Sequence, residues 1–334
     1  MTITAQQVRL RERPTGFPDD QTWEYTAVEL PPLADGQFLV KVDYLSLDPA
    51  MRGWLNDVRS YVRPVKIGAV MRAHGIGTVV ESRHGDFEVG KTVVGMFGAA
   101  DHAISDGQDV TRADLAIADA PTWLGTLGMT GMTAYFGLLD VGKVKTGDTV
   151  VVSGAAGAVG SVVGQVAKAK GATVIGIAGG LEKCTWLTET LGFDAAIDYK
   201  NESVTHRLRE LAPQGIDVFF DNVGGEILDS ALANLSRGAR IVICGAISSY
   251  NESKLPPGPS RYMSLLVFRA SMTGFVVFDF EDRYPEATEQ ISAWLADGTL
   301  IAREYVAEGG ISAFGDALTM LFNGANTGKL VLKV

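Results

Sequence analysis

The stretch VVVSGAAGAVGSVVGQVAKAKG, residues 150–171, decides the fold class of this 334-residue chain. It begins as an apolar run typical of a buried parallel strand, passes through a loop of small residues and continues as a helix. Small residues let phosphates approach the backbone, and a helix N-terminus offers free N–H groups and a partial positive charge. The loop Gly154–Gly160 is therefore predicted to bind a dinucleotide's pyrophosphate, through Gly157, Ala158 and Val159.

The glycine spacing departs from the G-x-G-x-x-G pattern, since Ala155 stands at its first glycine position and Gly154 comes one residue early. Gly157 and Gly160 occupy the other two positions. Such a motif is weak alone, and a strand–turn–helix that needs small residues only for packing would also produce it. The context is stronger, because strands and helices alternate after Gly147, which predicts a Rossmann-type doubly wound parallel sheet. The further strands are expected at 173–178, 196–199, 217–221 and 239–246.

The end of the second strand indicates which dinucleotide is bound. NAD enzymes usually place an Asp or Glu there to bind the ribose 2′-hydroxyl, whereas this chain has Ala178, Gly179 and Gly180. Lys183 follows on the next helix, and Tyr199 ends the third strand. Taken separately, Lys183 can be explained as a solvated lysine on a helix, and Tyr199 as an aromatic residue at the rim of the site. A missing acid beside a cation and a phenol favours the 2′-phosphate of NADP(H).

Outside this region, residues 1–125 are predicted to be rich in strands, at 38–47, 73–81 and 91–97. Residues 131–139 and 285–297 are expected to be helical, and 251–260 a proline-rich loop. Residues 265–278 are predicted to form an apolar strand, and the terminal KLVLKV a strand that folds back onto the N-terminal part.

Composition narrows the partners and the compartment. The net charge of −10 argues against nucleic acid or an anionic membrane as the main partner, because phosphate binding needs a basic surface. No uncharged apolar run reaches the length of a membrane span, and the N-terminus lacks a signal-peptide core. Cys184 and Cys244 are the only cysteines and are interpreted as free thiols. We therefore expect a soluble, cytoplasmic protein.

With these motifs established, the chain resembles the zinc-independent branch of the medium-chain dehydrogenases/reductases. That branch includes leukotriene B4 12-hydroxydehydrogenase/prostaglandin reductases, curcumin reductase and the alkenal double-bond reductases. The matching stretches run in the family's order from residue 44 to near the C-terminus: YLSLDPAMRG (44–53), GMTGMTAYFGLLDVG (128–142), SGAAGAVGSVVGQVAK (153–168), GGLEKC (179–184), FDNVGG (220–225), CGAISSYN (244–251), LPPGPS (255–260) and NGANTGK (323–329).

The resemblance implies a fold of two domains and a chemistry. Residues 1–129 and 303–334 would form a β-rich, GroES-like catalytic domain, and 130–302 the Rossmann NADP-binding domain. The implied reaction is NADPH-dependent reduction of the activated C=C bond of an enone or enal, with hydride added to the β-carbon. The protein would orient the reactants, and the cofactor would supply the hydride.

Residue roles carried over by position follow the same resemblance. Lys183 and Tyr199 would contact the 2′-phosphate, and Gly179 leaves room beside them. The remaining cofactor contacts would come from Met129 and Thr133 under the nicotinamide side, from Asn222, Cys244, Ser248 and Tyr250 along the cofactor, from Phe275, Val276 and Val277 near the nicotinamide, and from Asn326 and Gly328 in the C-terminal segment.

No catalytic zinc is expected, because the family's Gly-His-Glu motif is replaced here by Arg72-Ala73-His74. Charge developing on the enone oxygen would need a donor, for which the nicotinamide ribose 2′-hydroxyl and Tyr250 are the candidates. Tyr250 is equally explained as a structural residue at the start of a loop. Ala50 and Phe278 stand where many family members have tyrosine, so the substrate pocket should be more apolar. Tyr44, Met51, Arg52 and Trp54 are candidates for its wall, although core packing explains Trp54 equally well.

Two alternatives and an assembly question stay open at this point. The chain could reduce quinones, as a neighbouring branch does, or it could bind NADPH without catalysis. The stretches LPPGPS and CGAISSYN favour enone reduction. A homodimer is expected if the apolar strand at 265–278 forms an exposed sheet edge, and a monomer if that edge is covered.

Overall fold

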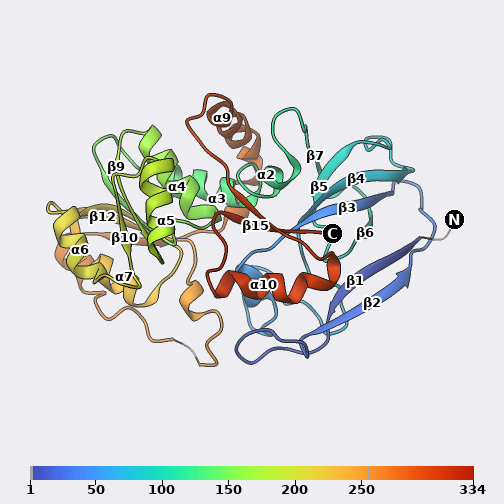
Figure 1. Ribbon diagram of the computed structural model, residues 1–334, viewed down its shortest axis with the longest axis horizontal. Coiled ribbons are helices and arrows are strands. Elements are labelled where there is room, and N and C mark those ends of the chain that lie inside the picture. The colour runs from blue at the N-terminus through green and yellow to red at the C-terminus, as the bar shows by residue number, and fades with distance from the viewer. Residues whose placement is uncertain (1–2, 255) are drawn as a thin grey trace. The chain divides into compact units, whose positions relative to one another are not determined.

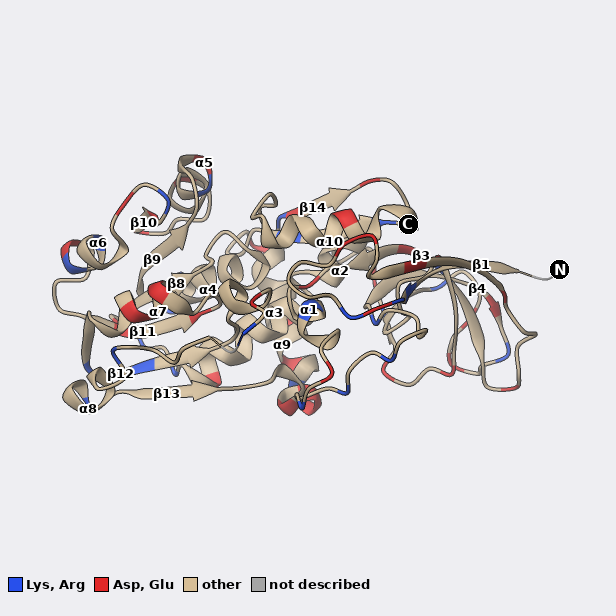
Figure 2. Cartoon of the chain, turned by 90° about the horizontal axis from the view of Figure 1, so that it is seen from below, with Lys and Arg blue, Asp and Glu red and all other residues tan. Residues whose placement is uncertain are grey.

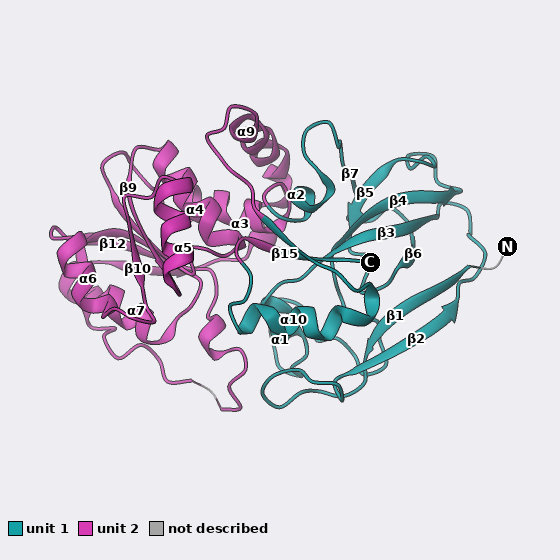
Figure 3. Cartoon of the chain, in the orientation of Figure 1, with its two compact units in different colours: residues 1–125, 304–326, 330–334 teal, residues 126–303, 327–329 magenta. Residues whose placement is uncertain are grey.

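The computed structural model describes residues 3–254 and 256–334, and these form two compact units (Figure 3). Unit 1 comprises residues 1–125, 304–326 and 330–334, and unit 2 comprises 126–303 and 327–329. The sequence-based ranges place the boundaries at 129/130 and 302/303, and they leave 327–329 with the first domain. The roles given to the two ranges, catalysis and cofactor binding, remain predictions. No helix in the described ranges is long and apolar enough to cross a membrane.

Unit 2 is built on a six-stranded sheet in the order β10-β9-β8-β11-β12-β13, with every strand pair in it parallel. Strands β9, β10 and β12 of this sheet are labelled in Figure 1. The sheet is the doubly wound α/β fold predicted from the 150–171 stretch. Its strands are β8 (Thr149–Ser153), β9 (Thr173–Ala178), β10 (Ala195–Asp198), β11 (Ile216–Asp221), β12 (Leu235–Ile243) and β13 (Ser271–Gly274). Its helices are α3 (Met129–Phe136), α4 (Ala158–Ala169), α5 (Leu181–Thr185), α6 (Val204–Leu211), α7 (Gly225–Leu232), α8 (Ser264–Phe268) and α9 (Tyr284–Ala296).

The core of unit 2 explains why its central strands are apolar throughout. Val151, Ile175 and Phe219 belong to one buried cluster with residues of α6 and α7. In the same sheet, Val150, Val152 and Phe220 are also fully buried, so β8 and β11 are covered on both faces. Parallel strands buried on both faces have the continuous apolar sequences seen here. This packing fixes the positions of the loops that leave their carboxyl ends.

Unit 1 is β-rich and holds a seven-stranded sheet in which β14, β15, β3, β4, β5 and β7 follow one another and β6 also pairs with β3. The C-terminal strand folds back as predicted, since Val331 of β15 lies opposite Ser46 of β3. The strands are β1 (Thr4–Leu10), β2 (Trp23–Glu29), β3 (Phe38–Ser46), β4 (Gly75–Ser82), β5 (Thr92–Gly95), β6 (His102–Ser105), β7 (Thr111–Arg112), β14 (Glu304–Ala307) and β15 (Lys329–Lys333). The helices are α1 (Ala50–Trp54), α2 (Ala120–Leu124) and α10 (Phe314–Phe322).

The structure corrects one element. Residues 265–278 are not one strand: helix α8 ends at Phe268, a four-residue strand follows at 271–274, and a 3₁₀ segment begins at Val277. Leu265 and Phe268 pack against the core while Leu266 and Val267 face solvent, which is the spacing of a helix. A short apolar run cannot be assigned to strand or helix by periodicity alone. Strand β13 does lie at the edge of the sheet.

Candidate functional site

The candidate site lies where the carboxyl ends of β8 and β11 meet in unit 2. These strands are neighbours, while the chain runs from β8 to β9 on one side and later returns to β11 on the other. Loops leaving neighbouring strands in opposite directions open a crevice, and ligands of doubly wound sheets bind at that switch point. The glycine loop after β8 and Asn222 after β11 stand at this point.

The glycine loop is shaped by close backbone contacts. Gly154 has φ +59°, a conformation that favours glycine, and its carbonyl accepts a hydrogen bond from Gly157 N at 2.9 Å. A Cβ on Gly160 would stand 2.4 Å from Gly154 O, so the first turn of α4 sits directly on the loop. The first intrahelical bond runs from Ser161 N to Gly157 O at 3.0 Å. The N–H groups of Ala158 and Val159 precede it, and no side chain caps this end, so the turn presents donors to an anion.

A buried carboxylate holds the two switch-point loops together. Asp221 Oδ1 accepts hydrogen bonds from Ser153 Oγ at 2.7 Å and from the N–H groups of Val223 and Gly224 at 3.0 Å. Asn222 donates its backbone N–H to Ser153 Oγ and its side-chain Nδ2 to Ser153 O. Burial raises the pKa of Asp221, and the hydrogen bonds to it oppose that rise. The amide of Asn222 is thereby fixed beside the glycine loop, where the sequence predicts a cofactor contact.

The loop after β12 joins the same network. Cys244 N donates to Asp221 O at 2.9 Å, and Ser248 Oγ donates to Val223 O at 2.6 Å. Burial raises the pKa of the Cys244 thiol to about 12, with a smaller contribution from the charge of Asp221. The Tyr250 hydroxyl turns back onto its own loop, where its oxygen accepts a hydrogen bond from Ala246 N at 3.2 Å. Cys244, Ser248 and Tyr250 are therefore gathered beside Asn222 in one rigid loop pair.

The ends of β9 and β10 form a second cluster around Gly179. A Cβ on Gly179 would stand 2.9 Å from both Tyr199 Cε1 and Lys200 Cε, so these two side chains lie over the glycine. Lys183, on α5, is near enough to Lys200 for that charge to lower its pKa, although burial is the larger cause. Sequence reasoning singled out Gly179, Lys183 and Tyr199 but missed Lys200. Its position directly after Tyr199 was the available signal.

The predicted nicotinamide contacts come from α3 and the segment after β13. Thr133 Oγ1 donates to Met129 O at 2.7 Å, so that hydroxyl is engaged within the helix. Phe275 packs inward, since a Cβ on Gly137 would stand 2.5 Å from its ring. Val277 is buried, and Val276 is half-buried between them. These residues belong to unit 2, and their role at the nicotinamide remains a prediction.

The C-terminal segment reaches the glycine loop through Gly328. Gly328 N donates to Ala156 O at 2.8 Å, and Gly328 forms a parallel bridge with Gly157. Its φ of +75° and a Cβ position 2.1 Å from Arg303 O leave no room for a side chain. Asn326 is a buried residue of unit 1, so its predicted place at the cofactor stays untested.

In unit 1, three of the residues predicted as a pocket wall are core residues. Met51 and Trp54 belong to the buried cluster of this unit, and Arg52 is 3% exposed. The Arg52 guanidinium donates to Gly16 O, Pro14 O and Asn56 Oδ1 and so fastens the N-terminal segment to α1. Tyr44 is only half-buried in β3. Arg52 is thus engaged in tertiary structure rather than turned toward a ligand.

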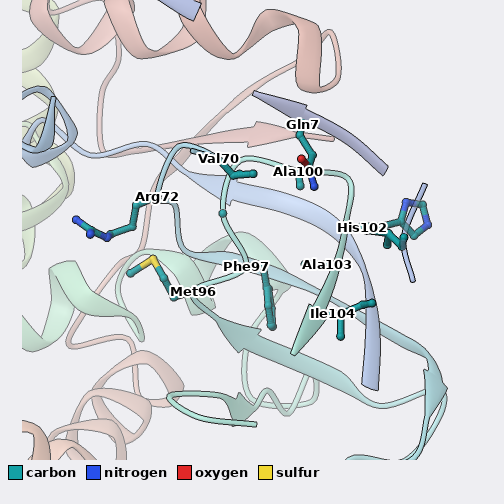
Figure 4. A pocket seen from close by; sticks show the side chains of 11 residues that line it. Gln7, Val70, Arg72, Met96, Phe97, Ala100, His102, Ala103 and Ile104 are labelled. Atoms are coloured by element: carbon teal, nitrogen blue, oxygen red, sulfur yellow. The ribbon is translucent and has the colours of Figure 1, made fainter. Parts of the chain in front are cut away.

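Unit 1 also contains a hollow of about 370 Å³, with Arg72 and Met96 at one end and His102 at the other (Figure 4). His102 is the histidine in its lining, and the Nδ1 atom of His102 lies 3.1 Å from Asp101 Oδ1. Arg72 stacks over the Trp54 ring and donates to Arg63 O. The lining offers no nucleophile beside a base, so the hollow is not assigned to the candidate site.

The residues at the switch point fit a dinucleotide. Gly157 and Gly160 have no side chains, so the strand–loop–helix junction leaves backbone donors exposed. Beside Gly179 lie Lys183 and Lys200, where an NAD site has an acid. Among residues 3–254 and 256–334, no three His, Cys, Asp or Glu side chains gather as a metal-ligand set. Acidic and basic side chains are interspersed over the elements of both units (Figure 2).

Comparisons with known proteins agree with this geometry. Residues 6–113 match a family described as the N-terminal domain of oxidoreductase, and residues 158–293 match one described as zinc-binding dehydrogenase. The NADPH-dependent curcumin reductase of Escherichia coli is 40% identical over 97% of this chain and 95% of its own length. Prostaglandin reductase 1 of Bos taurus is 40% identical over 99% of both chains. CurA of Vibrio vulnificus, solved with NADPH, is 43% identical and superposes with a TM-score of 0.93, covering 98% of this chain and 99% of its own.

Proposed function

Because this chain belongs to the medium-chain dehydrogenase/reductase family, in the branch of the curcumin and prostaglandin reductases, we propose that it reduces the activated C=C bond of α,β-unsaturated ketones and aldehydes with NADPH. The observation that carries the proposal is the cluster at Gly179, where Lys183, Tyr199 and Lys200 stand at the end of β9 in place of a ribose-binding acid. The relatives named as reductases supply the reaction class.

The protein's part in the reaction is positioning. Bound NADPH supplies the hydride. The N–H groups at the start of α4 would hold the pyrophosphate, and Lys183 would hold the 2′-phosphate. The Asp221 network keeps Asn222 and the Cys244–Tyr250 loop in place against the cofactor. As hydride reaches the β-carbon, the enone oxygen gains negative charge, and a proton from water then completes the α-carbon.

Tyr250 is the chain's own candidate for stabilising that oxygen. Its hydroxyl oxygen accepts a hydrogen bond from Ala246 N, and a tyrosine hydroxyl is a donor as well as an acceptor. Replacing Tyr250 by Phe should lower kcat for an enone about 10-fold or more, because oxyanion donors usually contribute at least that much. NADPH affinity should change little. An unchanged kcat together with a lowered Tm would assign Tyr250 to the support of its loop.

The decisive experiment is a steady-state panel. NADPH and NADH are each tested with enones of graded size, with a quinone and with no acceptor, and oxidation of the cofactor is followed. We expect acceptor-dependent oxidation of NADPH with enones, and a preference for apolar ones because Ala50 and Phe278 carry no hydroxyl. Turnover with quinones alone would favour the quinone reductase alternative. No acceptor-dependent oxidation at all would leave an NADPH-binding protein without catalysis.

The sheet edge supports a further proposal, that two copies of the chain form a homodimer. Strand β13 is the last strand of its sheet, and a sheet edge offers unpaired backbone groups to a second copy. Beside it, α8 exposes Leu266, 70% accessible, and Val267, 57% accessible. Such an apolar surface at a sheet edge is typical of an isologous interface. Leu266→Glu should convert a dimer to a monomer in sedimentation at micromolar concentration, and a monomeric wild-type protein would contradict the proposal.

We also propose a cytoplasmic location. Both cysteines are free, and Cys184 and Cys244 lie in the same unit without forming a disulfide. Unpaired thiols are the usual state in a reducing compartment. Imaging of a tagged chain in its host would test the location.

A further inference from the structure

Lys200 lies over Gly179, in the same cluster as Tyr199 and Lys183. Its Cε would be only 2.9 Å from a Cβ at Gly179, so the absence of a side chain there makes room for the lysine. Lys200 follows β10 directly, and β10 pairs in parallel with β9, with Asp198 opposite Ala178. The pairing therefore brings the residues after both strands to one place at the carboxyl edge of the sheet, which can be followed beside β10 and α5 in Figure 2.

The Asp198 carboxylate, two residues before Lys200, accepts its hydrogen bonds from other donors than the Lys200 ammonium. Asp198 accepts hydrogen bonds from Gly180 N at 2.7 Å, Lys200 N at 3.1 Å and Asn201 Nδ2 at 2.7 Å. These bonds hold the pKa of Asp198 below its usual range, with a smaller contribution from the charge of Lys200, and they engage both carboxylate oxygens. In the part of the chain that the structure describes, the Lys200 ammonium makes no ion pair or hydrogen bond. It is therefore available for an anion.

Two cations held close together are unfavourable without an anion between them. Burial is the larger cause that lowers the pKa of Lys183, the charge of Lys200 lowers it further, and the charge of Glu182 opposes both, so the two lysines are close enough for their charges to interact. A phosphate dianion would relieve that repulsion and accept charge-assisted hydrogen bonds from both lysines. A ribose 2′-hydroxyl would offer no charge and would leave the repulsion in place.

We propose that Lys200 is a specificity-determining residue that binds the 2′-phosphate of NADPH together with Lys183 and so discriminates against NADH. This inference rests on the proposed function, since it deepens the choice of cofactor. Tyr199, which lies over Gly179 as well, packs beside the same phosphate site. Lys200 is exposed and carries no tertiary hydrogen bond through its side chain, so its replacement should leave the fold intact.

The test uses two nucleotide probes that differ by one phosphate, adenosine 2′,5′-bisphosphate and adenosine 5′-monophosphate. Their dissociation constants are measured by calorimetry for the full-length wild type, for Lys200→Met and for Lys200→Arg. The control variant Lys145→Met removes an exposed lysine of the same unit that lies before β8, far along the chain from this cluster. Binding of the probes requires no turnover, so the result does not depend on finding the right enone.

Lys200→Met should weaken binding of the bisphosphate about 10-fold or more, since a charge-assisted hydrogen bond to phosphate is lost. Binding of the monophosphate should stay within about twofold of the wild type on the same reasoning, and Lys200→Arg should restore most of the loss. Lys145→Met should bind both probes as the wild type does. Equal weakening of both probes, or none, would overturn the role of Lys200 while the function stands. A wild type that binds both probes equally well would instead overturn the NADPH preference itself.

Discussion

Replacing Gly160 by Ala tests the glycine loop most directly. The added Cβ would stand 2.4 Å from Gly154 O, 2.8 Å from Ala155 Cα and 2.9 Å from Gly154 C. All three atoms are backbone, so no side chain can turn aside to relieve the contact. Ordinary contacts of this kind lie near 3.4 Å, and the loop must therefore move away from α4 by about 1 Å. The loop and the first turn of the helix are the two parts that hold the pyrophosphate.

A displacement of about 1 Å takes a hydrogen bond near 2.9 Å beyond the range in which it contributes. Loss of one charge-assisted bond to the pyrophosphate costs about 2 kcal/mol, which is about a 30-fold rise in the Kd for NADPH. Overpacking also costs about 1–3 kcal/mol of folding free energy. For a protein of this size, that corresponds to a fall in Tm of several degrees, at about 2–4 °C per kcal/mol.

Two control variants separate the two effects, with NADPH binding measured by calorimetry and Tm by calorimetric scan. Gly164→Ala lies one turn further along α4, where its Cβ would stand 1.9 Å from the buried ring of Phe193. It should lower Tm without moving the loop, so NADPH affinity should be retained. Gly85→Ala has nothing within 4 Å and should change neither quantity. An unchanged NADPH affinity in Gly160→Ala, or an equal loss in Gly164→Ala, would refute the reasoning.

Three further predictions follow from the same unit. The lowered pKa of Lys183 means that its ammonium loses its proton at a lower pH than an ordinary lysine does. NADPH affinity should therefore fall as the pH rises toward that pKa, and measuring the Kd for NADPH between pH 7 and 10 checks this. Lys183→Arg should remove the fall. Burial raises the pKa of Cys184 to about 11 and that of Cys244 to about 12, so both remain thiols at neutral pH. The native chain should therefore stay unlabelled after brief exposure to N-ethylmaleimide at pH 7.4, whereas the urea-unfolded chain should be labelled twice. Mass spectrometry measures both. Asp221→Ala leaves three donors without their acceptor and should lower the free energy of unfolding in urea by about 3 kcal/mol, whereas a loss below about 1 kcal/mol would mean that the network does not hold the loops.

The order of elements in unit 2 was predictable because its signals are local. An apolar run before a glycine loop and an amphipathic run after it specify strand, turn and helix within about twenty residues. The parallel sheet then follows from the repeated alternation. The prediction of one strand at residues 265–278 was wrong because a short helix and a short strand share one apolar stretch. Only packing against the core distinguishes Leu265 and Phe268 from the exposed Leu266 and Val267.

The candidate site was predicted less completely, for a different physical reason. Gly179, Lys183 and Tyr199 could be singled out by counting from the glycine loop. Lys200 directly follows Tyr199 and could have been named with it, whereas the contact of Gly328 with Ala156 joins segments about 170 residues apart. Likewise, nothing local shows that the Arg52 guanidinium is used up by backbone carbonyls. Such contacts are fixed by tertiary structure, which sequence spacing does not contain.

The interleaving of the two units has a consequence for the order in which the chain folds. Strand β15, residues 329–333, lies between β14 and β3 in the sheet of unit 1. It pairs with β3 across more than 280 positions of sequence, and nearly all of unit 2 is encoded between them. During synthesis, β6 can pair with residues 38–41 of β3, but residues 44–46 must wait for β15. Strand β15 is made only after residue 303, when unit 2 is nearly complete as a continuous piece. We expect unit 2 to acquire protease resistance first on a translating ribosome, and unit 1 to depend on chaperone protection until β15 has been made.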